Sequence, residues 1–179
     1  AIFITDTNGC TIDSVFSITE PSEISLTAII SNNNCFNDTT GSINISVGGG
    51  TPNYNYSWTN PLGQNISSSE DLSNLIADIY SITISDDSSC TKDSSFTITS
   101  PNEIFLNITT NNANCAFNDG SALANVTGGV LTSPDYTYDW DNDGLGDNDD
   151  ANSISSLASG NYTLYVTDDN GCQVDSTVS

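Results

Sequence analysis

The chain has almost no positive charge and no histidine. Lys92 is its only basic residue, whereas 23 aspartates and glutamates give a formal net charge of −22. A protein without a basic surface cannot displace counterions from phosphates, which excludes nucleic acid as a partner. The sequence also has no long apolar run, so we expect no direct membrane insertion. Such an acidic chain either remains a solvated, self-repelling polymer or recruits divalent cations.

The same absences leave few groups for catalysis. No histidine can act as a general base, and none of the cysteines has a base as a partner. The four glutamates are expected in turns or between domains, where they would not form a convergent acid–base pair. We therefore predict that this segment is not an enzyme.

What the sequence does contain is one six-residue motif that occurs three times. Residues 5–10 read TDTNGC, residues 85–90 read SDDSSC, and residues 167–172 read TDDNGC. Cys90 follows Cys10 by 80 residues, and a period of that size predicts tandem domains that are each large enough to fold alone. We assign residues 1–22 to the C-terminal part of a first repeat, 23–102 to a complete repeat, and 103–179 to a nearly complete one.

Apolar and polar residues alternate along most of the chain, a pattern typical of β-strands. Ile43, Ile45 and Val47 share one face of such a segment, as do Tyr54, Tyr56 and Trp58 of another. Glycine, proline, asparagine or aspartate bounds each run, which predicts short strands with frequent turns. The pattern favours an all-β fold: tandem Ig-like β-sandwiches of about seven strands, arranged end to end. Only residues 69–77 also have a helical interpretation.

Local signals within the third copy support this fold. Residues 157–162 (LASGNY) have the pattern of a tyrosine corner, in which a tyrosine hydroxyl bonds to the backbone a few residues upstream. Asn170-Gly171 predicts a two-residue hairpin turn before the last strand. Residues 140–144 (WDNDG) resemble the strand and turn of polycystic-kidney-disease (PKD) domains, so the sandwiches are described as PKD-like.

Five cysteines occupy matching positions in the repeats, without a CxxC pair and without histidine. This pattern does not make a zinc site. Disulfides are the better interpretation, because a domain of about 80 residues has a limited core and benefits from crosslinks. We therefore predict an oxidising, extracellular location.

Two disulfide arrangements are open, besides free thiols. Within a repeat, Cys35 would pair with Cys90, and Cys115 with Cys172. In a seven-strand sandwich, however, these partners lie at opposite ends, separated by roughly 20–25 Å along a strand of about seven residues. A disulfide needs Cα atoms within about 7 Å. Pairing across a domain junction, Cys35 with Cys172, satisfies that limit and would leave the other three cysteines without partners in this chain.

The most specific local motif is an acidic loop at residues 139–150, DWDNDGLGDNDD. Oxygen ligands at its positions 1, 3, 5, 9 and 12, with glycine at position 6, follow the spacing of a calcium-binding loop. The candidate Ca²⁺ ligands are Asp139, Asp141, Asp143, Asp147 and Asp150. Asp150 replaces the usual glutamate and no flanking helices are expected. The alternative is an acidic turn between two strands.

Several segments together resemble the SprB repeat. Residues 48–58 read GGGTPNYNYSW, residues 157–172 read LASGNYTLYVTDDNGC, and the segments ITEP (18–21) and CFNDTTG (35–41) agree with them. SprB-type repeats occur in very large cell-surface proteins of the Bacteroidota, including the mobile adhesins of gliding bacteria. The resemblance implies export by type IX secretion and display on the bacterial cell surface.

The sequence therefore predicts a structural and adhesive repeat segment that acts as a rigid extracellular spacer, with neighbouring repeats as its first partners. Self-association into filaments would fit the same geometry. Two alternatives are a calcium-dependent module that binds surface polysaccharide and accessory domains of a secreted enzyme. The sequence itself does not identify an adhesion target.

Overall fold

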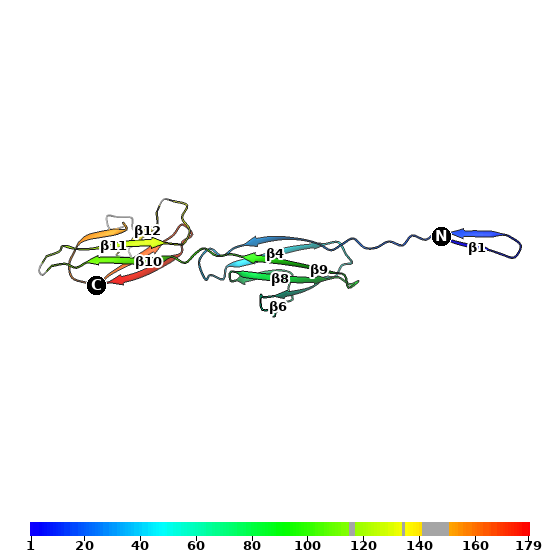
Figure 1. Ribbon diagram of the computed structural model, residues 1–179, viewed down its shortest axis with the longest axis horizontal. Coiled ribbons are helices and arrows are strands. Elements are labelled where there is room, and N and C mark those ends of the chain that lie inside the picture. Colours follow the sequence, from blue (N-terminus) through cyan, green and yellow to red (C-terminus); the bar gives the residue numbers. More distant parts are fainter. Residues whose placement is uncertain (115–116, 134, 141–150) are drawn as a thin grey trace.

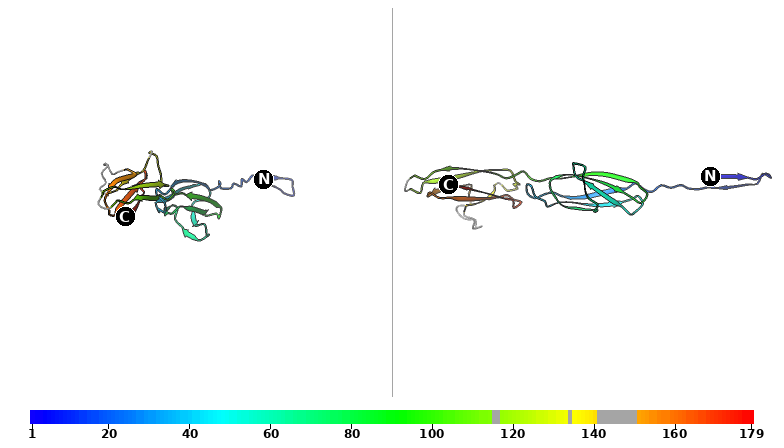
Figure 2. Two further views of the ribbon diagram at one scale, coloured as in Figure 1. Left: turned by 60° about the vertical axis from the view of Figure 1, so that its left-hand side comes forward. Right: turned by 90° about the horizontal axis from the view of Figure 1, so that it is seen from below.

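The computed structural model describes residues 1–114, 117–133, 135–140 and 151–179. Every regular element in these ranges is a β-strand, which confirms the all-β fold. Within them, no helix has the length and hydrophobicity that a membrane span requires. A hairpin and two sandwiches follow one another in a row, so the chain is strongly elongated (Figures 1 and 2).

The N-terminal hairpin consists of β1 (Ile2–Thr5) and β2 (Thr11–Ser14). The two strands pair in antiparallel fashion, from Ile2 opposite Ser14 to Thr5 opposite Thr11. All of their residues are exposed, and an extended segment connects the hairpin to the first sandwich (Figure 1).

The first sandwich packs a three-stranded sheet against a four-stranded one. The smaller sheet has the order β3 (Ser25–Ser31), β4 (Gly41–Gly48), β7 (Leu72–Leu75). The larger has the order β6 (Asn65–Ser67), β5 (Asn55–Thr59), β8 (Asp78–Ser85), β9 (Thr91–Ile98). These seven antiparallel strands make the Ig-like sandwich that the alternating pattern predicts.

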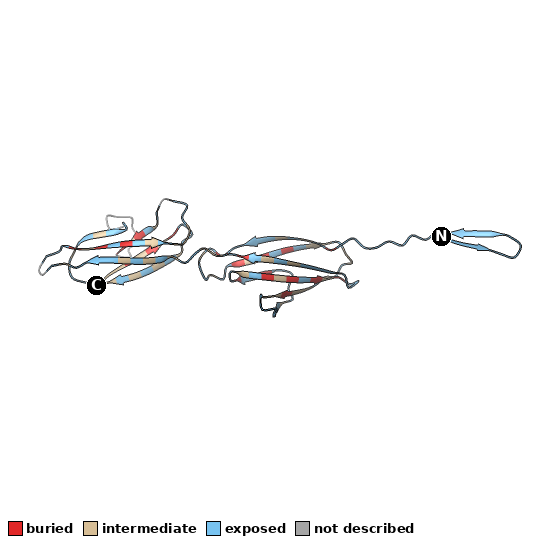
Figure 3. Cartoon of the chain, viewed as in Figure 1, coloured by how far each residue is buried: buried red, intermediate tan, exposed pale blue. Residues whose placement is uncertain are grey.

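The core of this sandwich lies between the two inner faces (Figure 3). Alternate residues of a strand point to opposite faces, so Ile43 and Ile45 of β4 and Ile82 and Ile84 of β8 are buried together. Trp58 is fully buried at their centre, and its indole Nε1–H donates to the Ser69 carbonyl at 3.0 Å. That bond satisfies the one polar group that the indole brings into the core.

Among the described residues, the second sandwich repeats this arrangement with two sheets of three strands each. One sheet has the order β10 (Phe105–Asn111), β11 (Gly120–Thr127), β13 (Ser153–Leu157). The other has the order β12 (Thr137–Asp139), β14 (Tyr162–Thr167), β15 (Gln173–Val178). Trp140, Leu164 and Val166 take the core positions of Trp58, Ile82 and Ile84. The Trp140 indole again bonds to a carbonyl, that of Ala151, at 3.0 Å.

Both sandwiches contain a tyrosine corner. The Tyr162 hydroxyl donates to the Ala158 carbonyl at 3.1 Å, and the Tyr80 hydroxyl donates to the Ile76 carbonyl at 3.2 Å. The helical interpretation of residues 69–77 is wrong. Leu72–Leu75 forms β7, because Leu72 and Leu75 are buried against β4 of the same sheet.

Candidate functional site at the repeat junction

The two ends of each sandwich are formed by different loops. We call the entry pole the end at which the chain enters the first strand; in the second sandwich it holds Ile104, Gly128-Gly129 and the hairpin loop 168–172. The exit pole is the opposite end, where the last strand leads into the next repeat; in the first sandwich it holds residues 32–38 and Thr99. The junction joins the exit pole of one sandwich to the entry pole of the next.

The hairpin loop of the entry pole is built around Asp168. Its Oδ1 accepts hydrogen bonds from the backbone N–H groups of Asn170 (3.0 Å) and Cys172 (2.9 Å). Gly171, with a φ of +80°, donates its N–H to the Asp168 carbonyl, and the Asp168 N–H bonds to the Cys172 carbonyl. The loop therefore has three residues, one more than the two-residue turn that Asn170-Gly171 predicts, with glycine at its left-handed position.

The other oxygen of the same carboxylate ties the hairpin to the glycine loop. Asp168 Oδ2 accepts from the Val130 N–H at 2.8 Å, and in the first sandwich Asp86 Oδ2 accepts from the Thr51 N–H at the same distance. The two aspartates are only 5% and 4% exposed. Backbone N–H groups, first that of Thr51, lower the pKa of Asp86, so it remains a carboxylate.

Two glycines are required where the glycine loop lies against the Asp168 carboxylate and the Glu103 carbonyl. Gly129 has a φ of +60°, and a Cβ added there would lie 2.7 Å from Asp168 Oδ2. A Cβ on Gly128 would lie 1.8 Å from the Glu103 carbonyl oxygen. The same loop receives the Tyr136 hydroxyl, which donates to the Gly128 carbonyl at 2.8 Å. Burial, followed by the nearby Asp168 charge, raises the pKa of Tyr136 and keeps the phenol protonated as a donor.

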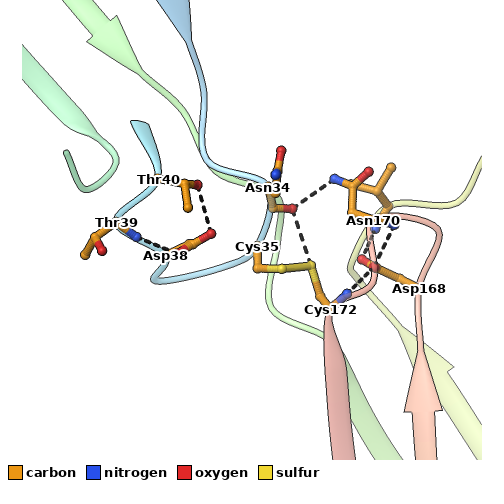
Figure 4. The surroundings of a disulfide bond; sticks show 9 residues. Asn34, Cys35, Asp38, Thr39, Thr40, Asp168, Asn170 and Cys172 are labelled. Carbon is orange, nitrogen blue, oxygen red and sulfur yellow. Dashed lines mark hydrogen bonds between the residues drawn. A yellow bond between two sulfur atoms is a disulfide. The ribbon is translucent and has the colours of Figure 1, made fainter. Parts of the chain in front are cut away.

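The junction itself is closed by a disulfide between Cys35 and Cys172 (Figure 4). Their Cα atoms lie 5.6 Å apart although the residues are 137 positions apart in the sequence. Beside the disulfide, the Asn170 side-chain amide donates to the Asn34 carbonyl at 2.9 Å (Figure 4). The first connection of one sandwich is thus bonded to the last hairpin of the next.

The loop that carries Cys35 is attached to the linker between the sandwiches. The Asn33 N–H bonds to the Thr99 carbonyl at 2.9 Å, and the Asn33 side chain donates to the Asp38 carbonyl at 2.8 Å. The Thr99 N–H in turn bonds to the Asn32 side chain at 3.0 Å. Because Thr99 directly follows β9, the linker and the Cys35 loop leave the first sandwich as one unit.

Sequence reasoning named the two cysteines of the junction but did not identify the structural role of the aspartate and the glycine pair beside them. The structure brings Cys35 and Cys172 together across the junction, while Cys90 and Cys10 are exposed free thiols. Cys115 lies outside the described residues. The missed signal was present in the repeats, since Asp86 and Asp168, like Gly49-Gly50 and Gly128-Gly129, recur at matching positions.

The calcium hypothesis remains a prediction. Asp139 ends β12, and Asp141, Asp143, Asp147 and Asp150 lie outside the described residues. In the part of the chain that is described, no group of three or more acidic or cysteine side chains is arranged to hold a metal ion.

Comparison with known proteins supports the repeat assignment. The SprB repeat family model matches residues 27–63 and 107–145. A comparison with curated proteins finds no match.

Three solved structures are similar in outline. A Dscam structure, solved for the basis of isoform specificity, has 12% identity and a TM-score of 0.39 over 88% of this chain and 45% of its own. The N-terminal eight Ig domains of Down Syndrome Cell Adhesion Molecule have 12% identity and a TM-score of 0.45, over 87% of this chain and 24% of that one. The amphioxus IgVJ-C2 molecule has 9% identity and a TM-score of 0.31, over 89% and 97%. The chain spans less than half the length of the first two, and we base no argument on likenesses this low.

The SprB matches fall one in each whole sandwich, over β3–β5 of the first and β10–β12 of the second. With the Ig-like fold and the disulfide, they identify a structural repeat segment of an extracellular surface protein. Each of the two sandwiches therefore contains a segment that matches the SprB repeat, the family that the sequence resembles.

Proposed function

We propose that the chain is a rigid extracellular spacer within a large adhesin of the bacterial cell surface. The observation that carries this proposal is the covalent bond between Cys35 and Cys172. Sandwiches joined by a single linker normally move relative to each other, because interfaces between such domains are small and polar. Here the linker and the disulfide make two covalent connections between the same two sandwiches.

Other features of the junction act in the same direction. Pro101 restricts the backbone within the linker, which runs from Thr99 to Ile104 between β9 and β10. The Asn170–Asn34 hydrogen bond adds a third connection at the same place. A net charge of −22 also disfavours folding of the string back on itself, because like charges repel.

In this proposal the immediate partners are neighbouring repeats, and the segment has no catalytic role. SprB repeats and Ig-like domains are typically non-enzymatic structural units. Adhesion, and a contribution to gliding motility, would then depend on the length and stiffness of the string. Polysaccharide binding through a calcium-loaded loop at 139–150 is the competing function, and it depends only on the acidic sequence there.

The test is whether the two sandwiches tumble as one body. In the oxidised chain, ¹⁵N relaxation should give a single anisotropic rotational diffusion tensor for both sandwiches. The Cys35→Ser variant should give two faster, partly independent ones, whereas the control Cys90→Ser should behave like the parent. Independent tumbling in the oxidised chain would rule out a rigid spacer. Calcium-dependent binding of the isolated chain on a glycan array would favour the binding module instead.

A further inference from the structure

We infer that the entry pole of the first whole sandwich is a docking site for the Cys-containing loop of a repeat that precedes it. The docked loop would be of the Cys35 type, and it would be crosslinked to Cys90. This inference rests on the proposed function, because it extends the same junction to a second position in the string.

The hairpin that carries Cys90 has the geometry of the hairpin that carries Cys172. Asp86 Oδ1 accepts from the backbone N–H groups of Ser88 (2.9 Å) and Cys90 (2.8 Å), and its Oδ2 reaches the glycine loop as Asp168 does. The Asp86 N–H bonds to the Cys90 carbonyl at 3.0 Å, as the Asp168 N–H does to that of Cys172. The backbone at Cys90, whose thiol is exposed, is therefore held by the same hydrogen bonds as the backbone at Cys172, which forms the junction disulfide.

A matching groove lies beside each of these cysteines. At the second sandwich it is lined by the linker residues 101–104, by hairpin residues that include 171–174, and by Cys35 and Phe36 of the preceding repeat. At the first sandwich the corresponding groove is lined by residues 20–24 and 90–92 alone. Pro21, Ser22, Glu23 and Ile24 stand where Pro101, Asn102, Glu103 and Ile104 stand one repeat later. The groove beside Cys90 thus shares the linker wall and the cysteine-bearing wall of the Cys35-loop site, with Lys92 in the place of Val174.

The occupied groove defines what fits the other one. The loop in that groove has a cysteine followed by a phenylalanine, Cys35 and Phe36. Its base is bonded to the end of the last strand of its own sandwich, because the Asn33 N–H donates to the Thr99 carbonyl. One contact is not shared. Ser88 replaces Asn170, and its hydroxyl bonds to Thr51 Oγ1 at 2.9 Å instead of crossing the junction. The junction at Cys90 therefore depends more on the disulfide than the junction at Cys172 does.

The crosslink forms by thiol–disulfide exchange with a low-molecular-weight disulfide such as oxidised glutathione. One protein thiolate attacks the small disulfide, forms a mixed disulfide and releases one small thiol. The second protein thiolate displaces the other small thiol and completes the protein S–S bond. Two protein thiols are oxidised, one small disulfide is reduced to two thiols, and the two protons of the protein thiols end on the released thiols.

The test places a complete repeat in front of Cys90 within the full chain. Residues 23–102 are duplicated in tandem, so that residues 1–102 are followed by residues 23–179 and the linker sequence of the natural junction is kept. After refolding with oxidised and reduced glutathione, free thiols are alkylated and disulfides are mapped under non-reducing conditions. We expect a crosslink between the upstream Cys35 and the downstream Cys90, alongside the Cys35–Cys172 bond. Cys10, which has no whole repeat before it, should remain fully alkylated.

Two matched variants identify the partners. Cys35→Ser in the upstream copy should abolish the Cys90 crosslink and leave the Cys172 crosslink intact; the same change in the downstream copy should do the reverse. Full alkylation of the downstream Cys90 while Cys35–Cys172 forms would overturn the inference, and so would a crosslink between Cys35 and Cys90 of one copy. The relaxation measurement on the parent chain is independent. A rigid parent with an unlinked Cys90 would refute the docking site and leave the spacer function standing.

Discussion

The two sandwiches agree in the aspartate–glycine contact at their entry poles and in the position of the core tryptophan, but they differ in a hairpin turn and in one connection. Asp86 and Asp168 make equivalent hydrogen bonds, and a Cβ added at Gly50 or Gly129 would lie at nearly the same distance from the carboxylate. In contrast, the turn residue with positive φ is Ser89 in one hairpin and Gly171 in the other. The acidic stretch after β12 also has no counterpart after β5. The contact between the aspartate and the glycine loop is therefore constant between the two repeats, whereas the turn of the hairpin and the connection after β5 or β12 vary.

The largest expected effect tests whether the glycine loops are equivalent. Gly50→Ala and Gly129→Ala should each destabilise their own repeat by about 3–4 kcal/mol, because a Cβ at positive φ would meet a carboxylate oxygen. The distances are 2.6 Å to Asp86 Oδ2 and 2.7 Å to Asp168 Oδ2. Amide hydrogen exchange, which reports the opening of each sandwich separately, is the measurement.

A glycine in the first repeat provides the control for that experiment. Gly63 also has a positive φ, +73°, but a Cβ added there meets nothing within 4 Å. Gly63→Ala should therefore cost only the backbone contribution, about 1 kcal/mol. Equal losses at Gly50 and Gly63 would contradict the steric explanation of the pole.

The next largest effect is the loss of stability when the core tryptophan of either sandwich is replaced. Trp58→Leu and Trp140→Leu should each destabilise their repeat by about 2–3 kcal/mol, through lost volume and the loss of the indole hydrogen bond. Trp58 also packs against Phe96, with ring centroids 6.0 Å apart, whereas Val178 takes the place of Phe96 in the second repeat. The loss at Trp58 should therefore be larger by about 0.5–1 kcal/mol. Denaturant unfolding followed by NMR of each repeat measures both; a larger loss at Trp140 would contradict this ranking.

A smaller effect concerns the hairpin turns. Ser89 has a φ of +65°, a conformation that glycine adopts without strain. We expect Ser89→Gly to stabilise the first repeat by about 0.5–1 kcal/mol and Gly171→Ser to destabilise the second by a similar amount. Thermal unfolding monitored by circular dichroism checks the two shifts. Changes of the same sign would show that the turns are not interchangeable.

The smallest effect depends on pH. The Asp169 carboxylate accepts hydrogen bonds from the backbone N–H and hydroxyl groups of Ser133 and Thr132, and these bonds lower the pKa of Asp169. Its counterpart in the first repeat, Asp87, accepts one hydrogen bond from the Asn53 side chain, at 2.8 Å. A carboxylate with a lowered pKa stabilises the fold above its ordinary pKa of about 4, and the contribution is lost as the pH falls below that value. Asp169→Asn should therefore destabilise the second repeat slightly at pH 7, since the group is exposed and screened by solvent.

Urea unfolding at several pH values measures that difference. The gap between Asp169→Asn and the parent should shrink as the pH falls below about 4, and Asp87→Asn should produce a smaller gap at pH 7. A gap that stays constant down to pH 2 would contradict the assignment to the carboxylate.

Much of the fold was readable from the sequence because its signals are local or repeated. Alternation along β4 and β8 predicted the buried faces, and residues 157–162 predicted the tyrosine corner at Tyr162. Residues 69–77 were ambiguous because β7 is short and is fixed by pairing with β4, which is a long-range contact. The poles were missed for a similar reason: the Asp86–Thr51 bond joins residues 35 positions apart, and no local pattern announces it.

The N-terminal hairpin illustrates the same limit. It contains the repeated six-residue motif, and Asp6 Oδ1 accepts from the Cys10 N–H at 2.8 Å just as Asp168 does from Cys172. Yet Ile2 and Ile4 are 51% and 61% exposed, whereas their counterparts Ile82 and Ile84 are 1% and 0% exposed. The six-residue motif is sufficient to form the hairpin turn, but burial of the two strands requires the opposing sheet of the sandwich.

The Cys35–Cys172 disulfide has a mechanical consequence. Pulled from its ends, an unfolded chain lengthens by roughly 3.3–3.6 Å per residue. The two cysteines are 137 positions apart, and the chain between them lies inside a covalent loop, so force applied at the termini passes through the S–S bond and bypasses that chain. The disulfide thereby prevents roughly 450–490 Å of extension. Under load, the part of the chain from Cys35 to Cys172 would keep a nearly fixed length while it is oxidised, and reduction would make it extensible.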